Sequence, residues 1–149
     1  MRIPPDIEFE EDIRLFIYRP RGLLDAASVD RAVTVLGEFE KNQKEPFNRC
    51  LDTSAIDRLE LNYQYVIQVS LYRVLTYAHR PAVKSAMLAT DSTVAHYFQL
   101  HAIITEDSPI NVRIFRELGD AAKWLAVPVE RLAEIPAGPS DQIEGSSKE

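Results

Sequence analysis

The spacing of hydrophobic and polar residues alternates along the chain between a period of two and a period near 3.6. Over residues 13–18 apolar side chains recur at every second position, which predicts a β-strand. Over residues 29–39 they recur at helical spacing, behind an N-cap candidate at Asp25 or Ser28. Gly37 inside this predicted helix costs about 1 kcal/mol relative to alanine. The sequence offers no packing reason for it.

The same two periods predict further strands and helices. The predicted strands cover residues 7–9, 47–52, 83–90 and 111–115. The predicted helices cover residues 59–80, 91–104 and 118–126, with a last helical turn after Pro128, and Asp91 or Ser92 is the N-cap candidate of the second one. Strands that alternate with helices predict a mostly parallel sheet joined by crossover helices. We expect one α/β domain over residues 1–135. The polar, Pro/Gly/Ser-rich tail over residues 136–149 is predicted to be disordered.

The predicted helix over residues 59–80 is the longest in the chain and is apolar on most sides. Such a helix is buried by its own sheet and by a second surface. The second surface is either another protein chain or the core of the same chain, and the sequence leaves both open. Tyr63, Tyr65 and Tyr72 suit an interface, because tyrosine combines contact area with a polar tip. A homodimer through this helix and a separate protein partner are both candidate assemblies.

Polar residues follow the predicted strand over residues 47–52. Asp52, Thr53 and Ser54 stand at its carboxyl end, which is where open α/β sheets bind their ligands. The alternative, and the commoner role of such residues, is to turn the chain and cap the next element. The residues that we predict to bind a ligand or partner are Asp52, Thr53, Ser54, Asp57, Tyr63 and Ile67.

Composition and charge narrow the classes of partner. The net charge of −6 argues against nucleic acid and against anionic membrane surfaces, because both attract basic patches. Cys50 is the only cysteine, and its place in a predicted strand favours a small buried side chain over a nucleophile. No segment has the length of a membrane span, and the first residues lack the apolar core of a signal peptide. We expect a cytoplasmic protein without membrane insertion.

Sequence motifs for known chemistry are absent. His96 and His101 lie five positions apart on one predicted helix, about 140° apart around its axis, so they do not share a metal ion. A core role is the better interpretation of His101. The sequence lacks a glycine-rich phosphate loop, a nucleophile elbow and a dinucleotide fingerprint. We predict no catalytic residue, no metal and no cofactor. The basic residues expected to be scattered in solvent are Arg73, Arg80, Lys84 and Arg113.

Three segments carry a resemblance to a known superfamily. IRLFIYRPRGLLDAASV looks like its opening strand, glycine and helix, CLDTSAIDRLEL like its central strand and loop, and VRIFRELGDAAKWL like its closing strand and helix. Together they resemble the STAS superfamily, named for sulfate transporters and anti-sigma-factor antagonists, over residues 13–125. More closely, the chain resembles bacterial proteins of unknown function with the sporulation anti-sigma-antagonist-like fold. The resemblance implies a STAS-like sheet of four to five mostly parallel strands.

One departure from the superfamily bears on function. The anti-sigma antagonists carry an Asp-Ser-Ser/Thr-Gly run in which a serine or threonine is phosphorylated. In this chain the corresponding position falls near Leu59, Glu60 and Leu61, and no serine, threonine or glycine stands there. The resemblance therefore implies a non-enzymatic binding or regulatory module without the phosphorylation switch.

A different function, binding of a small apolar molecule or a lipid, is the principal alternative. It requires a pocket between the sheet and the helices, lined by side chains such as Phe16, Tyr63, Ile67 and Phe98. The lipid-binding CRAL-TRIO domains share part of the topology, although this chain lacks their extra helices and their length.

An enzyme is the third alternative. Asp52, Asp57 and Glu60 supply three carboxylates within nine residues, and paired carboxylates perform acid–base chemistry when their pKa values differ. This function requires the three side chains to converge in one cleft.

Overall fold

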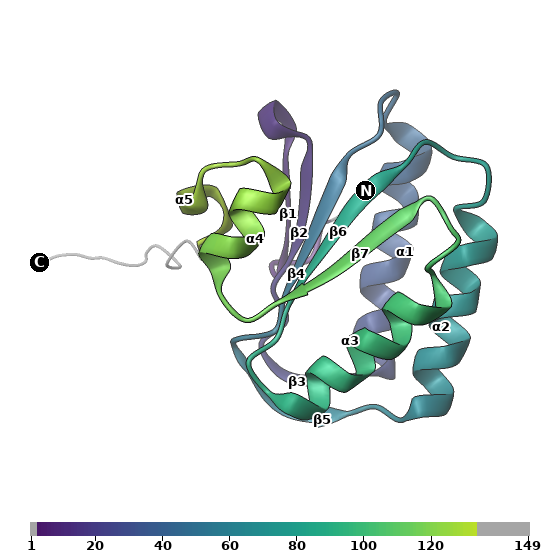
Figure 1. The fold of residues 1–149 in the computed structure, drawn as a ribbon, viewed down its shortest axis with the longest axis vertical. Helices are drawn as coiled ribbons and strands as arrows, with labels where there is room; N and C mark the ends of the chain where they lie inside the picture. Colours follow the sequence, from purple (N-terminus) through teal and green to yellow (C-terminus); the bar gives the residue numbers. More distant parts are fainter. Residues whose placement is uncertain (1–2, 134–149) are drawn as a thin grey trace, which may run out of the picture.

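A five-stranded β-sheet runs through the centre of the molecule (Figure 1). The computed structural model describes residues 3–133, and the sheet has the strand order β1-β2-β4-β6-β7. Its strands are β1 (Ile7–Glu10), β2 (Leu15–Tyr18), β4 (Asn48–Asp52), β6 (Val83–Leu88) and β7 (Ile110–Phe115). Only the β1–β2 pair is antiparallel among these neighbours. The predicted mostly parallel sheet is therefore confirmed.

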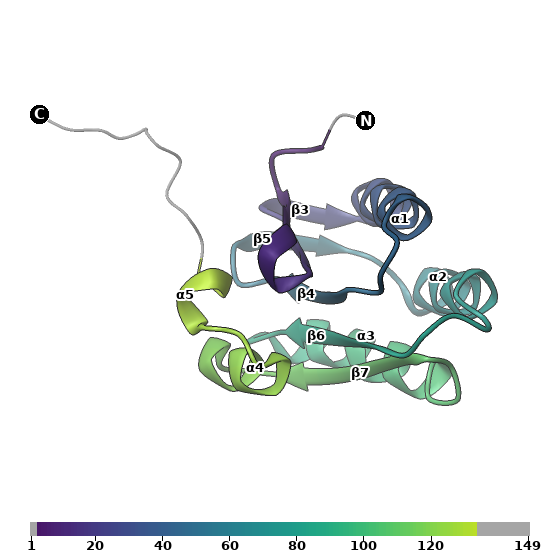
Figure 2. The same ribbon diagram turned by 90° about the horizontal axis from the view of Figure 1, so that it is seen from above.

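Helices cover both faces of this sheet, as the two ribbon views show (Figures 1 and 2). One face carries α1 (Ala26–Asn42), α2 (Tyr63–Thr76) and α3 (Ser92–Ile104), and the other carries α4 (Leu118–Leu125) and α5 (Val129–Leu132). A short 3-10 helix, η1 (Glu11–Ile13), precedes β2. Parallel neighbours need crossover connections, and α1, α2 and α3 lie within the three that this sheet requires.

A second sheet of two parallel strands contains residues 56–60, and the prediction for these residues was wrong. It pairs β3 (Gly22–Asp25) with β5 (Ile56–Glu60), so residues 56–60 form a strand where a loop and a helix start were predicted. The following helix, α2, begins only at Tyr63. Leu59 lies opposite Leu24 of β3, which is buried. A strand that depends on a distant partner leaves little local signal, because side-chain packing decides its stability.

Polar side chains at the helix N-termini explain where the helices begin. The Asp25 carboxylate accepts a hydrogen bond from the backbone N–H of Ser28 at 2.9 Å, and Asp91 accepts two from the first turn of α3. Asn62 accepts one from the backbone N–H of Tyr65 at 2.8 Å. Each cap satisfies N–H groups that have no partner inside their own helix. Asp25 and Asp91 were N-cap candidates in the sequence, and both are confirmed.

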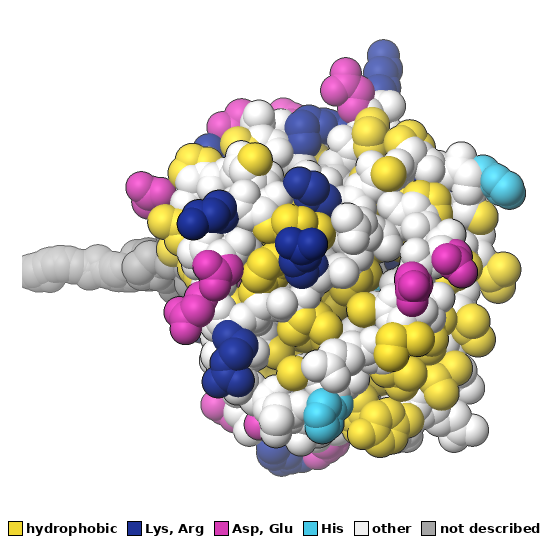
Figure 3. All heavy atoms as spheres, viewed as in Figure 1, with side chains coloured by type: hydrophobic (Ala, Val, Ile, Leu, Met, Phe, Trp, Pro, Cys, Tyr) yellow, Lys and Arg dark blue, Asp and Glu magenta, His cyan; other side chains and the backbone are white. Residues whose placement is uncertain are grey.

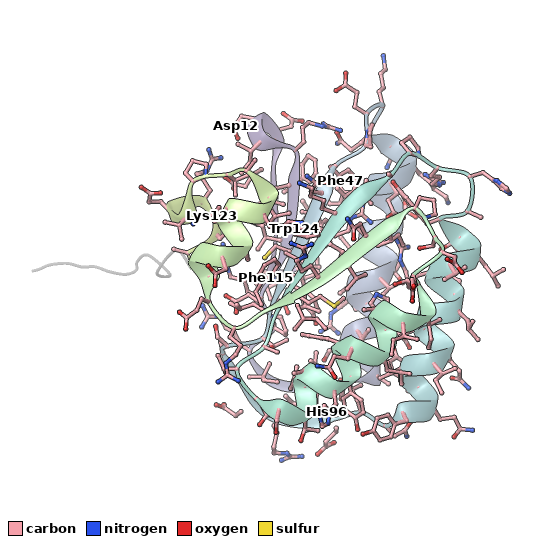
Figure 4. All side chains as sticks on the ribbon, in the orientation of Figure 1. Asp12, Phe47, His96, Phe115, Lys123 and Trp124 are labelled. Atoms are coloured by element: carbon pink, nitrogen blue, oxygen red, sulfur yellow. The ribbon has the colours of Figure 1, made fainter. Side chains whose placement is uncertain are left out.

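Two groups of buried side chains lie on the two faces of the sheet. Successive residues of a strand point to opposite faces. In β2, Leu15 and Ile17 therefore belong to the core under α4 and α5, while Phe16 belongs to the core under α1. On the α4 side, Phe115 and Trp124 lie beside each other with ring centroids 5.6 Å apart (Figure 4).

The C-terminal tail and the absence of a membrane span were both predicted from the sequence. The tail predicted over residues 136–149 lies outside the described residues. In the described part of the chain, no helix has both the length and the apolar character needed to cross a membrane.

Candidate functional site

The loop after β4 holds three of the residues predicted to bind a ligand, and their hydrogen bonds are internal. The Asp52 carboxylate accepts from the backbone N–H of Ser54 at 2.9 Å and from its hydroxyl at 2.7 Å. The Thr53 hydroxyl donates to the carbonyl oxygen of Leu88 at 2.8 Å. These bonds turn the chain and join β4 to β6, which is the alternative role that the sequence left open. A ligand-binding role for the three residues stays a prediction.

The three carboxylates of the enzyme alternative do not converge. Asp52 is buried, whereas Asp57 and Glu60 are exposed on β5. A separation of three positions along a strand places the last two on opposite faces. Glu60 forms an exposed ion pair with Arg58. The structure therefore contradicts the arrangement that an enzyme built on these carboxylates would need.

The outer face of α2 is apolar and exposed. Tyr63, Ile67, Leu71 and Leu75 recur at four-residue spacing, and each is at least 40% exposed. Hydrophobic side chains gather over α2 and α3 in the space-filling view (Figure 3). The sequence left open whether another protein chain or the core of the same chain buries this helix. For the outer face of α2, burial in the core of the same chain is therefore wrong. Partner binding by Tyr63 and Ile67 stays a prediction.

A cavity of about 160 Å³ lies between the larger sheet and helices α1, α2 and α3. Apolar side chains from the sheet and from all three helices dominate its walls, among them Phe16, Leu51, Met87, Ala32, Val66 and Phe98. Phe16 and Phe98 were predicted to line such a pocket, and both are confirmed. Tyr63 and Ile67 were wrong as lining residues, because they stand on the outer face of α2. An apolar cavity of about 150 Å³ in another protein binds benzene.

Three charged residues at one end of the cavity form a buried ion network. The Glu40 carboxylate of α1 accepts hydrogen bonds from Arg49 of β4 at 2.6 Å and from Arg73 of α2 at 2.5 and 3.2 Å. Each side chain is only 6–7% exposed. Burial lowers the pKa of Arg49, although a guanidinium stays charged at neutral pH. Two cations therefore share one anion.

This network was not predicted, although the sequence contains one signal for it. Arg49 stands inside a segment that was predicted to be a buried strand. A buried charge requires a partner of opposite sign, because its transfer out of water is otherwise too costly. That partner, Glu40, lies on the preceding helix, α1, nine positions earlier in the sequence.

His101 of α3 lines the cavity beside α2. Its Nδ1 atom lies 2.7 Å from the hydroxyl oxygen of Ser70. Burial, and to a smaller extent the charge of Arg73, lowers the pKa of His101 to about 4. The ring is therefore neutral at pH 7 and belongs to the core, as predicted. His96, in contrast, is exposed on α3 (Figure 4).

The tyrosines of the cavity wall have their hydroxyls engaged elsewhere. Tyr65 donates to the Asp30 carboxylate at 2.5 Å, and Tyr97 donates to the carbonyl oxygen of Leu61 at 3.0 Å. Tyr18 donates to a backbone carbonyl of α1 at 3.3 Å. Burial raises the pKa of Tyr18 to about 12 and also raises the pKa of Tyr65. The hydroxyls of Tyr18 and Tyr65 therefore stay protonated at neutral pH.

Two further kinds of reactive site are candidates: the thiol of Cys50 and groups of side chains that could bind a metal ion. Cys50 is buried, and this burial raises the pKa of its thiol to about 12. The thiolate, which is the nucleophilic form, is therefore not populated at neutral pH. Across residues 3–133, no group of three or more histidine, cysteine, aspartate or glutamate side chains is arranged to hold a metal ion.

The four basic residues that were expected to be scattered in solvent form two pairs. Arg73 and Arg80 lie over the ring of Tyr77, at 5.9 and 5.7 Å from its centroid. Lys84 and Arg113 lie over the tryptophan ring of α4, at 5.3 and 5.2 Å. The two pairs stand on opposite faces of the sheet and form no common basic patch. The expectation was wrong for Arg73, which is buried.

Comparisons with known proteins bear on the fold. Neither the protein-family models nor the curated proteins contain a match to the sequence. The structure is similar to the crystal structure of an uncharacterized protein of the DUF3478 family with a SpoIIAA-like fold, from Shewanella loihica PV-4. The TM-score is 0.51 at 15% identity, over 80% of this chain and 90% of that chain. The chain has a STAS-like fold. This confirms the resemblance that the three sequence segments indicated.

In the anti-sigma antagonists that the sequence resembles, the phosphorylated serine or threonine stands at the start of the helix after the central loop. In this chain that helix is α2, with Asn62 as its N-cap, and its first turn contains no serine or threonine. The first serine of α2 is Ser70, which is buried beside His101. Residues 59–61, which the sequence comparison had placed at the switch, lie at the end of β5 and just after it.

Proposed function

We propose that this protein is a non-enzymatic binding module that holds a small apolar molecule between its sheet and helices α1, α2 and α3. The observation that carries this proposal is the cavity of about 160 Å³ with its mainly apolar walls. Protein interiors are packed as densely as organic crystals and leave few voids larger than a water molecule. Concave, largely apolar sites are the usual form of small-molecule binding sites.

The protonation states around the cavity support binding rather than catalysis. His101 is neutral, the Cys50 thiol is protonated, and the hydroxyl of Tyr18 has a raised pKa. A general acid or base works best when its pKa lies near the operating pH. None of these three groups meets that condition.

The experiment is a thermal-unfolding measurement with toluene as the probe. A ligand that binds only the folded state stabilises it by RT ln(1 + L/Kd), where L is the free ligand concentration, so Tm rises with that concentration. We expect toluene to raise the Tm of the natural protein and to have much less effect on Ala32→Leu, which places a larger side chain at the cavity wall. Equal Tm values with and without toluene, together with a purified protein that carries no small molecule by native mass spectrometry, would contradict the proposal.

A protein partner at the outer face of α2 is a second candidate function, with a regulatory role. Its support is the exposed apolar row of Tyr63, Ile67, Leu71 and Leu75. The test is light scattering on the natural protein and on the double variant Leu71→Glu/Leu75→Glu. A dimer that the double variant dissociates supports self-association. Gln68→Glu is the control, because it adds a charge at an exposed polar position of the same helix.

A further inference from the structure

The polar groups of the cavity wall gather at one end. Arg49 and Ser85 are paired in register on neighbouring strands and reach the cavity from the sheet. Arg73 of α2 joins them through Glu40, which binds both guanidinium groups. The far end is formed by apolar residues such as Leu24 and Leu61, which precede α1 and α2. The cavity is therefore amphipathic along its length.

The polar end carries unmatched positive charge. Two guanidinium groups share the single carboxylate of Glu40, and His101 beside them is neutral. None of the described residues that line the cavity is an aspartate or a glutamate. A buried charge without a full counter-charge costs several kcal/mol. An anion at this end would therefore be held more strongly than a neutral group of the same shape.

Two hydrogen-bond donors at the polar end have no acceptor among residues 3–133. Nε of Arg49 is fully buried and unbonded. The Ser85 hydroxyl is also without a partner, although Ser85 is only 6% exposed and lines the cavity. Buried polar groups in native proteins are nearly always hydrogen-bonded, and an unbonded one costs about 1–3 kcal/mol. The Ser85 hydroxyl therefore stands at the cavity wall, where a ligand oxygen would satisfy it, beside the buried charge of Arg49.

We propose that the molecule bound in the cavity is a small apolar carboxylate. Its carboxylate group accepts hydrogen bonds from Arg49 and Ser85 beside the charge of Arg73, and its apolar body extends toward Leu24 and Leu61. The volume favours an aromatic or short-chain acid over a long lipid chain, because a space of this size suits a benzene-sized body. This inference rests on the proposed function and adds the charge of the ligand to it.

The experiment compares benzoate with benzamide, which has the same shape and no charge. Binding to the natural protein is measured at pH 7 by isothermal titration calorimetry, with toluene as the purely apolar probe in the thermal assay. Charge-assisted hydrogen bonds are roughly twice as strong as neutral ones. We therefore expect benzoate to bind at least about tenfold more tightly than benzamide, which corresponds to about 1.4 kcal/mol.

Two variants locate the preference at the polar end. Arg73→Gln leaves Arg49 and Glu40 as a balanced pair, so the preference for benzoate is expected to disappear while benzamide still binds. Ser85→Ala is expected to weaken benzoate by about tenfold, through loss of one charged hydrogen bond. Ser92→Ala is the matched control, because Ser92 is exposed at the start of α3 and does not line the cavity. If a variant does not fold, the comparison of benzoate with benzamide on the natural protein still tests whether the cavity prefers a carboxylate.

Each outcome separates the two levels of the proposal. Equal affinity for benzoate and benzamide overturns the carboxylate and leaves the apolar binding module standing. An equal preference for benzoate in Arg73→Gln and in the natural protein also overturns it. Failure of benzoate, benzamide and toluene alike overturns the binding module itself.

Discussion

The two faces of the central sheet bury their residues in different ways. Under α4 and α5, the core is made of fully apolar and often small side chains, such as Leu15, Ala86 and Ala121, which are all 0% exposed. Under α1, α2 and α3, the interior holds a cavity of about 160 Å³ and an ion network around Glu40. One sheet therefore supports a densely packed face and a face with unfilled space and buried charge.

The difference distinguishes the apolar packing that stabilises the fold from a cavity and buried charges that stability does not require. Filling a core with apolar side chains is sufficient for stability, and buried ion networks are often no better than apolar replacements. Space and charge on one face therefore require a reason other than stability. Departures from local packing rules are expected at functional sites. The candidate site is therefore the cavity on the α1–α3 face.

The largest effect is expected from removing the shared anion of the charged face. Glu40→Ala leaves Arg49 and Arg73 buried without a counter-charge, and should lower the free energy of unfolding by about 3–5 kcal/mol. Urea unfolding measures it. Glu38→Ala on the same helix is the control, since Glu38 makes no ion pair within the described residues. Similar losses in both variants would show that Glu40 is not a buried partner.

The second prediction is a pH dependence of the stability that arises from His101 on the cavity face. Burial lowers the pKa of His101 from its ordinary value of 6.5 to about 4. The unfolded chain therefore binds the proton first, so stability is fully present above about pH 6.5 and falls as the pH drops toward 4. The shift corresponds to a loss of up to about 3 kcal/mol.

Urea unfolding at several pH values between 7 and 4.5 measures this loss. The slope against pH should be smaller in His101→Gln than in the natural protein. His96→Gln replaces the exposed histidine of the same helix and should keep the natural slope. Identical slopes in all three proteins would show that His101 is not held neutral by burial.

The third prediction sets the two faces against each other with the same substitution. Ala122→Leu enlarges a side chain that is 3% exposed in the dense core, and overpacking there should cost about 1–3 kcal/mol. Ala32→Leu enlarges a side chain at the cavity wall, where space is available, and should be neutral or slightly stabilising. Midpoints of urea unfolding compare them. Equal destabilisation by both would remove the packing difference between the faces.

The dense face was largely predictable from the sequence. Alternation in residues 13–18 and helical spacing in residues 118–126 correspond to β2 and α4. On the opposite face, Asp25 and Asp91 were identified as N-cap candidates of α1 and α3, because a cap is a local interaction between a side chain and the next turn. These features need no knowledge of distant partners.

The cavity face was predictable only in part, because its features depend on contacts between distant segments. Phe16 and Phe98 were expected to line a pocket, but the polar loop after β4 was favoured as the site. The pairing of β3 with β5 and the Glu40–Arg49–Arg73 network join residues far apart in sequence. Hydrophobic periodicity carries no information on which charges meet or on where space is left unfilled.

The smallest predicted effect concerns Gly37 on α1, the helix that covers the cavity face. No neighbouring atom other than its own helix lies within 4 Å of the position that a Cβ would occupy. Gly37→Ala should therefore stabilise the protein by about 0.5–1 kcal/mol, because alanine has the higher helix propensity and loses less entropy on folding. Gly22→Ala is the contrasting control, since Gly22 has a φ of 70° and alanine is strained there. Urea unfolding should move the two midpoints in opposite directions, and a loss of stability in Gly37→Ala would show that α1 needs the glycine for closer packing than the structure shows.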